Sequence, residues 1–183
     1  MIEPSIALVE TNSVAAGILS GDTMVKKAVV QLLEARPICP GKYMVLIGGE
    51  VGPVREAYQV GVAAAADALV DQLMLPNVHL SVFPALMSAA PPRGYEALGI
   101  IETVTAAVCI LAADAAAKTT EVQLLEIRLA NGLGGKSYVL MEGTVADVEA
   151  AVEVGVELVR QEGLLIRKVI IPQLHNQMRE KIL

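Results

Sequence analysis

Short apolar runs alternate with amphipathic stretches along this chain. The runs of four to eight residues are typical of strands, and the longer stretches repeat apolar residues at helical spacing. Asp22 and Lys26 fall on the outer side of the first such stretch, which begins at Ser13. Pro76 limits the last strand to an edge or an end. The pattern predicts strand 5–10, helix 13–28, strand 29–35, strand 42–49, helix 54–69 and strand 73–79.

The second half of the chain repeats the first half in register. The segment ALVET (7–11) recurs as GIIET (99–103), and VQLLEAR (30–36) recurs as VQLLEIR (122–128). A proline-rich linker, SAAPPRG (88–94), separates the halves. We therefore predict two domains, 1–90 and 96–183, here called the first and second repeat. The fold class is α+β, a tandem duplication of a domain with ferredoxin-like topology, each with a four-stranded antiparallel sheet and helices.

Composition narrows the classes of protein to which this chain could belong. The formal net charge of −6 leaves no basic surface for nucleic acid. Mean hydropathy is high, at +0.56, yet charge-free stretches such as 103–113 fall short of the roughly 20 apolar residues that span a bilayer. The first ten residues lack a basic region, so we expect no signal peptide. Apolar residues make up 54% of the chain, a surplus that indicates extended subunit interfaces.

Two cysteines are the main candidates for chemistry, and we expect both to be reduced thiols in the cytosol. Cys39 lies in ICPGK, a turn between two predicted strands, and Leu133 stands at its position in the second repeat. Taken alone, a single cysteine in a turn is most often a bystander. Cys109 lies within a predicted helix, where a free cysteine is usually a buried small hydrophobic residue.

Two histidines occupy equivalent places in the repeats. His79 and His175 end the segments LPNVH and IPQLH. They could be metal ligands, but their separate domains favour a structural placement near a subunit edge. Glu10 and Glu102 end equivalent strands and have no nucleophile or base beside them in the sequence, so they do not indicate catalysis.

Several motifs together carry a resemblance to a known family. ALVET, DTMVKKAVVQLLEARPICPGK, GGEVGPVREA and the LPNVH and IPQLH endings resemble the bacterial microcompartment shell domain over the full length of the chain. ICPGK in the first repeat and NGLGGK in the second are most similar to the PduT-like tandem shell proteins of propanediol-utilisation compartments. The resemblance implies a homotrimer that imitates a six-fold shell tile, located in a microcompartment shell within the cytoplasm, and no enzymatic activity.

The same resemblance implies a site at the central pore. In this family the loop between the second and third strands surrounds the pore, and three chains bring their loop cysteines to the three-fold axis. Cys39 would then bind one [4Fe–4S] cluster per trimer, with zinc as the lesser alternative. The residues expected to line the pore are Ile38, Pro40, Gly41, Gly132, Leu133, Gly134 and Gly135. Neither glycine-containing loop fits a nucleotide-binding pattern.

The resemblance also implies an edge contact between tiles. Lys26 and Lys118 match the family's edge lysine, and the alternative is an ordinary solvated lysine on a helix. Expected partners are other shell proteins and an encapsulated redox enzyme, with no nucleic acid and no membrane. The predicted function is a shell tile that passes electrons or delivers a cluster across the shell. A tile with a gated metabolite pore and no cluster is the alternative, and an enzyme or sensor ranks last.

Overall fold

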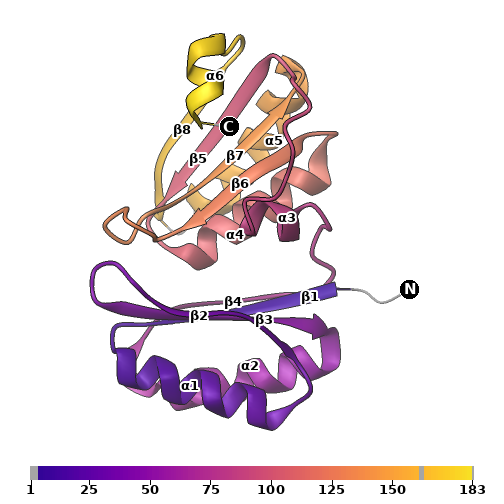
Figure 1. Ribbon diagram of the computed structural model, residues 1–183. Helices are drawn as coiled ribbons and strands as arrows, with labels where there is room; N and C mark the ends of the chain where they lie inside the picture. Colours follow the sequence, from indigo (N-terminus) through magenta and orange to yellow (C-terminus); the bar gives the residue numbers. More distant parts are fainter. Residues whose placement is uncertain (1–3, 161–162, 183) are drawn as a thin grey trace. The chain divides into compact units, whose positions relative to one another are not determined.

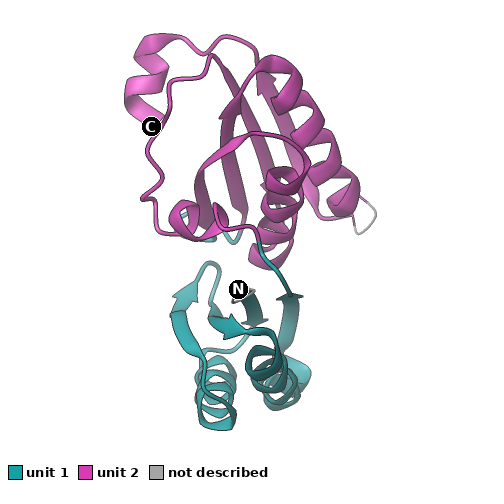
Figure 2. Cartoon of the chain, turned by 90° about the vertical axis from the view of Figure 1, so that its right-hand side faces the viewer, with its two compact units in different colours: residues 1–78, 130–135 teal, residues 79–129, 136–183 magenta. Residues whose placement is uncertain are grey.

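The computed structural model describes residues 4–160 and 163–182. The predicted domain ends at residues 1 and 183, and part of the N-terminal segment examined for a signal peptide, lie outside this range. Contacts divide the chain into two compact units, with 1–78 and 130–135 in unit 1 and 79–129 and 136–183 in unit 2 (Figure 2). The bounds 1–90 and 96–183 follow the sequence repeat and stay a prediction.

Unit 1 is a four-stranded antiparallel sheet with two helices on one face (Figure 1). Ser13 caps the first helix by accepting a hydrogen bond from the amide of Ala16, which satisfies one of the free N–H groups of the first turn. The sheet order is β2-β3-β1-β4. Its elements are β1 (Pro4–Thr11), α1 (Val14–Lys27), β2 (Gln31–Ile38), β3 (Lys42–Glu50), α2 (Val51–Ala65) and β4 (Leu69–Leu75).

The structure corrects the boundaries of the last two predicted elements of the first repeat. The helix predicted over 54–69 spans Val51–Ala65, because Ala66 has a positive φ of 48° and opens a single 3-10 turn. The strand predicted over 73–79 begins at Leu69, which pairs with Thr11. It ends before Pro76, which has no N–H to donate to the ladder.

Unit 2 repeats this plan with the sheet order β6-β7-β5-β8. One short helix follows the last strand of each repeat, and the sequence pattern predicted neither of them. The one after the first repeat, α3 (Val82–Leu86), belongs to unit 2. The elements of the second repeat are β5 (Ala97–Thr103), α4 (Ala106–Thr119), β6 (Gln123–Leu129), β7 (Ser137–Gly143), α5 (Val145–Arg160), β8 (Leu165–Ile171) and α6 (Asn176–Ile182).

Each unit has its own hydrophobic core. In unit 1 the core lies between the sheet and its helices, with Val9, Met24, Ile47 and Val54 buried together. In unit 2 α4 and α5 cover one face of the sheet, and α6 lies on the opposite face (Figure 2). No helix within the described residues is both long and apolar enough to cross a membrane. The predicted α+β tandem fold is confirmed.

Candidate functional site

Cys39 lies in a three-residue turn that joins β2 to β3. Its side chain is exposed and forms no disulfide, and Pro40 beside it is exposed as well. Ile38, the last residue of β2, is buried and fixes the turn to the sheet. Gly41 closes the turn with a positive φ of 74°, a conformation that glycine adopts without steric cost. The turn therefore presents a thiol to solvent on a firmly paired hairpin.

A buried ion pair stands directly behind this turn. Lys42 Nζ lies 2.6 Å from Glu10 Oε1, and the Glu10 side chain is fully buried. The second repeat has the equivalent pair, with Lys136 Nζ 2.7 Å from Glu102 Oε1. Glu10 and Glu102, the two carboxylates near the ends of equivalent strands, thus each take part in one ion pair. Both carboxylates hold the lysine that follows the loop of their own repeat.

The loop of the second repeat, residues 130–135, belongs to the same compact unit as Cys39. The Cys39 amide donates a hydrogen bond to the Ala130 carbonyl, with 3.4 Å between nitrogen and oxygen. Gly135 has a φ of +92°, and a Cβ there would come within 2.8 Å of the Cys39 carbonyl oxygen. Gly132 and Gly134 are exposed and also have positive φ, while Leu133 is half-buried. The two loops that are predicted to line the pore therefore contact each other at Cys39.

One chain supplies a single exposed sulfur. Within residues 4–160 and 163–182, no group of three His, Cys, Asp or Glu side chains is placed to hold a metal ion. Cys109 is fully buried in α4, as predicted. Its burial raises the pKa of the thiol to about 12, only partly offset by a hydrogen bond with Thr103. Cys109 is therefore a protonated packing residue at neutral pH.

The two histidines lie shortly before the short helices α3 and α6. His79 Nδ1 lies 2.7 Å from the Ser81 hydroxyl and accepts a hydrogen bond from the Ser81 amide. His175 Nδ1 accepts a hydrogen bond from the Gln177 amide. The His79 amide donates to Asp114 Oδ1 at 2.7 Å. Both histidines therefore have local structural roles. Asp114, which accepts the bond from the His79 amide, was not predicted as a site residue, although Asp22 stands at its position in the first repeat.

The two candidate edge lysines each pair with an aspartate one turn earlier on the same helix. Lys26 Nζ lies 2.6 Å from Asp22 Oδ2, and both side chains are well exposed. Lys118 Nζ lies 2.6 Å from Asp114 Oδ2, which is nearly buried. Both helices thus carry the same i, i+4 ion pair, and the assignment of these lysines to a tile edge stays a prediction.

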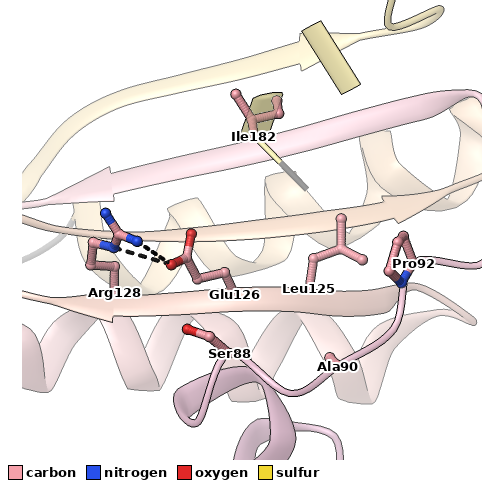
Figure 3. Close-up of a pocket in the computed structure, with 7 residues that line it drawn as sticks. All are labelled: Ser88, Ala90, Pro92, Leu125, Glu126, Arg128 and Ile182. Atoms are coloured by element: carbon pink, nitrogen blue, oxygen red, sulfur yellow. Dashed lines mark hydrogen bonds and ion pairs between the residues drawn. The ribbon is translucent and has the colours of Figure 1, made fainter. Parts of the chain in front are cut away.

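Unit 2 also has a small polar pocket of about 150 Å³, between the linker after α3 and the end of α6 (Figure 3). Arg128 pairs with Glu126 on its floor, and the guanidinium lies 5.8 Å from the centre of the Tyr138 ring. Burial and the hydrogen bond to Glu126 raise the pKa of Tyr138 to about 12. Glu126, Arg128 and Tyr138 therefore satisfy one another. The sequence pattern did not indicate this cluster, because Glu126 and Arg128 come from β6 and Tyr138 comes from β7.

The comparison with protein families matches both halves of the chain. The family described as the BMC domain matches residues 5–78 and again residues 97–174. The chain belongs to the BMC domain family. The two matched segments include the loop between the second and third strands of each repeat.

Individual relatives match this chain across both repeats. The bacterial microcompartment shell protein PduT of Citrobacter freundii is 43% identical over 174 residues, which cover 95% of each chain. The carboxysome assembly protein CcmO of Synechocystis is 32% identical and covers 94% of this chain, which spans 62% of that protein. A crystal structure of a microcompartments protein from Desulfitobacterium hafniense superposes with a TM-score of 0.90, at 49% identity, and covers 97% of this chain and 98% of that one. This BMC protein is therefore a shell tile of a bacterial microcompartment with tandem BMC domains.

Proposed function

We propose that three molecules of this BMC protein form a pseudohexameric tile whose central pore binds an iron–sulfur cluster through Cys39. The tile would pass electrons, or deliver the cluster, across the shell. The observation that carries the proposal is the exposed thiol on the β2–β3 turn, set against Leu133 in the second repeat. A three-fold axis repeats one cysteine three times, whereas a true hexamer would repeat it six times.

The donor set fits the cluster in its chemistry. Thiolates are the usual protein ligands of iron–sulfur clusters, and Cys39 is exposed on a turn with no disulfide partner. Leu133 offers no donor atom, so three chains supply three sulfurs and leave one iron for water or another ligand. When bound, the cluster would supply one-electron redox chemistry. Zinc is the lesser alternative, since it also accepts three sulfurs and a water.

The residues around Cys39 would hold the loop in place. The Lys42–Glu10 pair fixes the strand that leaves the turn, and the hydrogen bond to Ala130 fixes the Cys39 amide. Leu133, half-buried on the neighbouring loop, would limit access of water to the sulfurs. The proposal includes other shell proteins as partners in the sheet and a redox enzyme inside the compartment. The tile itself carries out no catalysis.

Anaerobic reconstitution with iron and sulfide tests the proposal. We expect the parent protein to bind about four iron and four sulfide per trimer and to absorb near ~400 nm, as thiolate-ligated clusters do. Cys39→Ser should lose all of the iron, because every chain loses its only ligand. Cys109→Ala is the matched control and should keep the parent's iron, since that thiol is buried and protonated.

Two results would overturn the cluster. A parent trimer that stays colourless would favour the alternative, a tile with a gated metabolite pore. Iron retained in full by Cys39→Ser would place the metal elsewhere. Native mass spectrometry of the same samples tests the trimer separately, because a stable monomer would remove the three-fold axis on which the site depends.

A further inference from the structure

The loop between β6 and β7 contains Asn131, and glycine follows it directly. Asn131 is exposed, and its side chain has no hydrogen-bond partner within the residues that the structure describes. No regular element fixes its backbone, because the loop separates the two strands. The side-chain amide of Asn131 is therefore free to approach its own main chain.

The next residue, Gly132, brings a reactive nitrogen beside that amide. Gly132 is exposed and has a φ of +72°, and a Cβ built there would have no atom within 4 Å. Its amide has no hydrogen-bond partner among residues 4–160 and 163–182. Glycine has no side chain to hinder the approach of its nitrogen, and it rotates more freely than other residues. Both groups needed for a reaction between Asn131 and Gly132 are thus unobstructed.

The other asparagines of the chain are held differently, and none of them precedes a glycine. Asn77 precedes Val78, whose amide donates to the Pro4 carbonyl with 2.9 Å between nitrogen and oxygen. Asn176 precedes an amide that donates to a histidine ring. Asn12 donates its own amide to a main-chain carbonyl and precedes the N-cap residue of α1. Asn131 therefore differs from the others both in sequence and in structure.

We propose that Asn131 is a site of spontaneous deamidation, through a succinimide ring formed with Gly132. The deprotonated amide nitrogen of Gly132 attacks Cγ of Asn131, the bond from Cγ to Nδ2 breaks, and the side-chain nitrogen leaves as ammonia. Water then adds to either ring carbonyl. Addition at Cγ gives aspartate, and addition at the main-chain carbonyl carbon gives isoaspartate. One water is consumed and one ammonia is released, and no electron is transferred.

The products change the charge and the length of the loop. A neutral amide becomes a carboxylate, so the formal net charge falls from −6 by one unit. Isoaspartate also carries the main chain through Cγ, which adds one backbone atom. Ala130, which accepts the hydrogen bond of the Cys39 amide, directly precedes Asn131. Isoaspartate should therefore loosen the contact between this loop and the turn at Cys39.

Incubation of the full-length protein in mildly alkaline buffer tests the proposal. Trypsin, used at mildly acidic pH, cleaves after Arg128 and Lys136 and releases residues 129–136, which contain no other asparagine. Mass spectrometry should show this peptide converting at least about tenfold faster than those with the other asparagines, because only glycine leaves the attacking nitrogen unhindered. Isoaspartate should be found among the products by chromatography against synthetic standards. Asn131→Gln is the matched control and should stay unmodified, since its longer side chain would have to close a larger ring.

Two further measurements separate the effect of structure from that of sequence. The synthetic peptide 129–136 should convert at a rate close to that of the folded loop, whereas synthetic peptides around Asn77 and Asn176 should convert faster than the same segments in the folded chain. Hydrogen exchange then follows the contact at Cys39. The Cys39 amide should exchange faster in aged protein than in fresh protein, and ageing should not change its exchange in Asn131→Gln.

Each contrary result is specific. A loop that stays intact while the free peptide converts would overturn the proposal, because the fold would then protect Asn131. Aspartate without isoaspartate would indicate direct hydrolysis and overturn the succinimide. Equal conversion of all the asparagines would refute the assignment to this loop, and unchanged exchange of the Cys39 amide would refute the effect on the candidate site. The reaction needs one chain and no iron, so these results are independent of the proposed function.

Discussion

In the first repeat the ring of Tyr43 lies against Gly17, while in the second repeat Ser137 and Cys109 occupy the same two positions. Tyr43 pairs with Thr11 across the sheet, and Ser137 pairs with Thr103. A large strand residue thus faces a helix residue without a side chain, and a small strand residue faces a larger one. The exchange keeps the space between helix and sheet filled, as close-packed interiors require.

This comparison separates the two cysteines by role. Cys109 is fully buried at the position that Gly17 has in the first repeat, and its burial explains its protonated state. Cys39 fills no space, since its side chain is exposed. Of the two thiols, only Cys39 is placed to react with something outside its own chain.

The largest expected difference lies in thiol reactivity. In iron-free protein at pH 8, iodoacetamide should alkylate Cys39 and leave Cys109 unmodified. A pKa of about 12 leaves one Cys109 in ~10⁴ as thiolate at that pH, and burial blocks the reagent as well. Peptide mass spectrometry over time measures both rates. Equal rates would contradict the separation, and unfolding in urea should make both thiols react.

The exchange of large and small residues predicts a specific steric conflict. Gly17→Ala should lower the free energy of unfolding by about 1–3 kcal/mol, because the new Cβ would lie 2.5 Å from the Cβ of Tyr43. The combination with Tyr43→Ser should show favourable coupling of at least about 1 kcal/mol in a double-mutant cycle. Urea denaturation measures each term. Additive effects would mean that Tyr43 moves away at no cost.

The two aspartates should differ in what they stabilise. Asp114→Ala should cost about 1–3 kcal/mol of chain stability, because it removes a nearly buried acceptor of the His79 amide and the partner of Lys118. Asp22→Ala should change chain stability by less than about 0.5 kcal/mol, since its ion pair is exposed. Equal losses of chain stability in urea denaturation would contradict the difference in burial.

The smallest effect on the single molecule is expected at the lysines. Lys26→Ala combined with Lys118→Ala should leave the trimer intact and change stability by less than about 1 kcal/mol, because both ammonium groups are exposed. Extended sheets in electron microscopy should become sparse if these lysines lie at tile edges. Arg55→Ala, an exposed cation on α2, serves as the control. Unchanged sheets would contradict the edge assignment and leave both residues as ordinary solvated lysines.

Much of the fold was determined by the sequence alone. Apolar periodicity and the internal repeat predicted the β-α-β-β-α-β order, and the antiparallel sheets confirm it. The start of α1 was predictable because Ser13 is a strong N-cap. The turn at Cys39 was predictable because Pro40 and Gly41 lie between two apolar runs. The burial of Cys109 was predictable because a free cysteine within an alanine-rich helix is usually a buried small hydrophobic residue.

Only the tertiary structure decided where the short helices lie and what they contact. The five residues of α3 are too few to show a helical period, and their burial depends on β6 and α4 rather than on their own order. The bond from His79 to Asp114 joins a segment after the first repeat to a helix of the second, a pairing that local pattern cannot express. The physical reason is that hydrogen bonds depend on distance in space and not on distance along the chain.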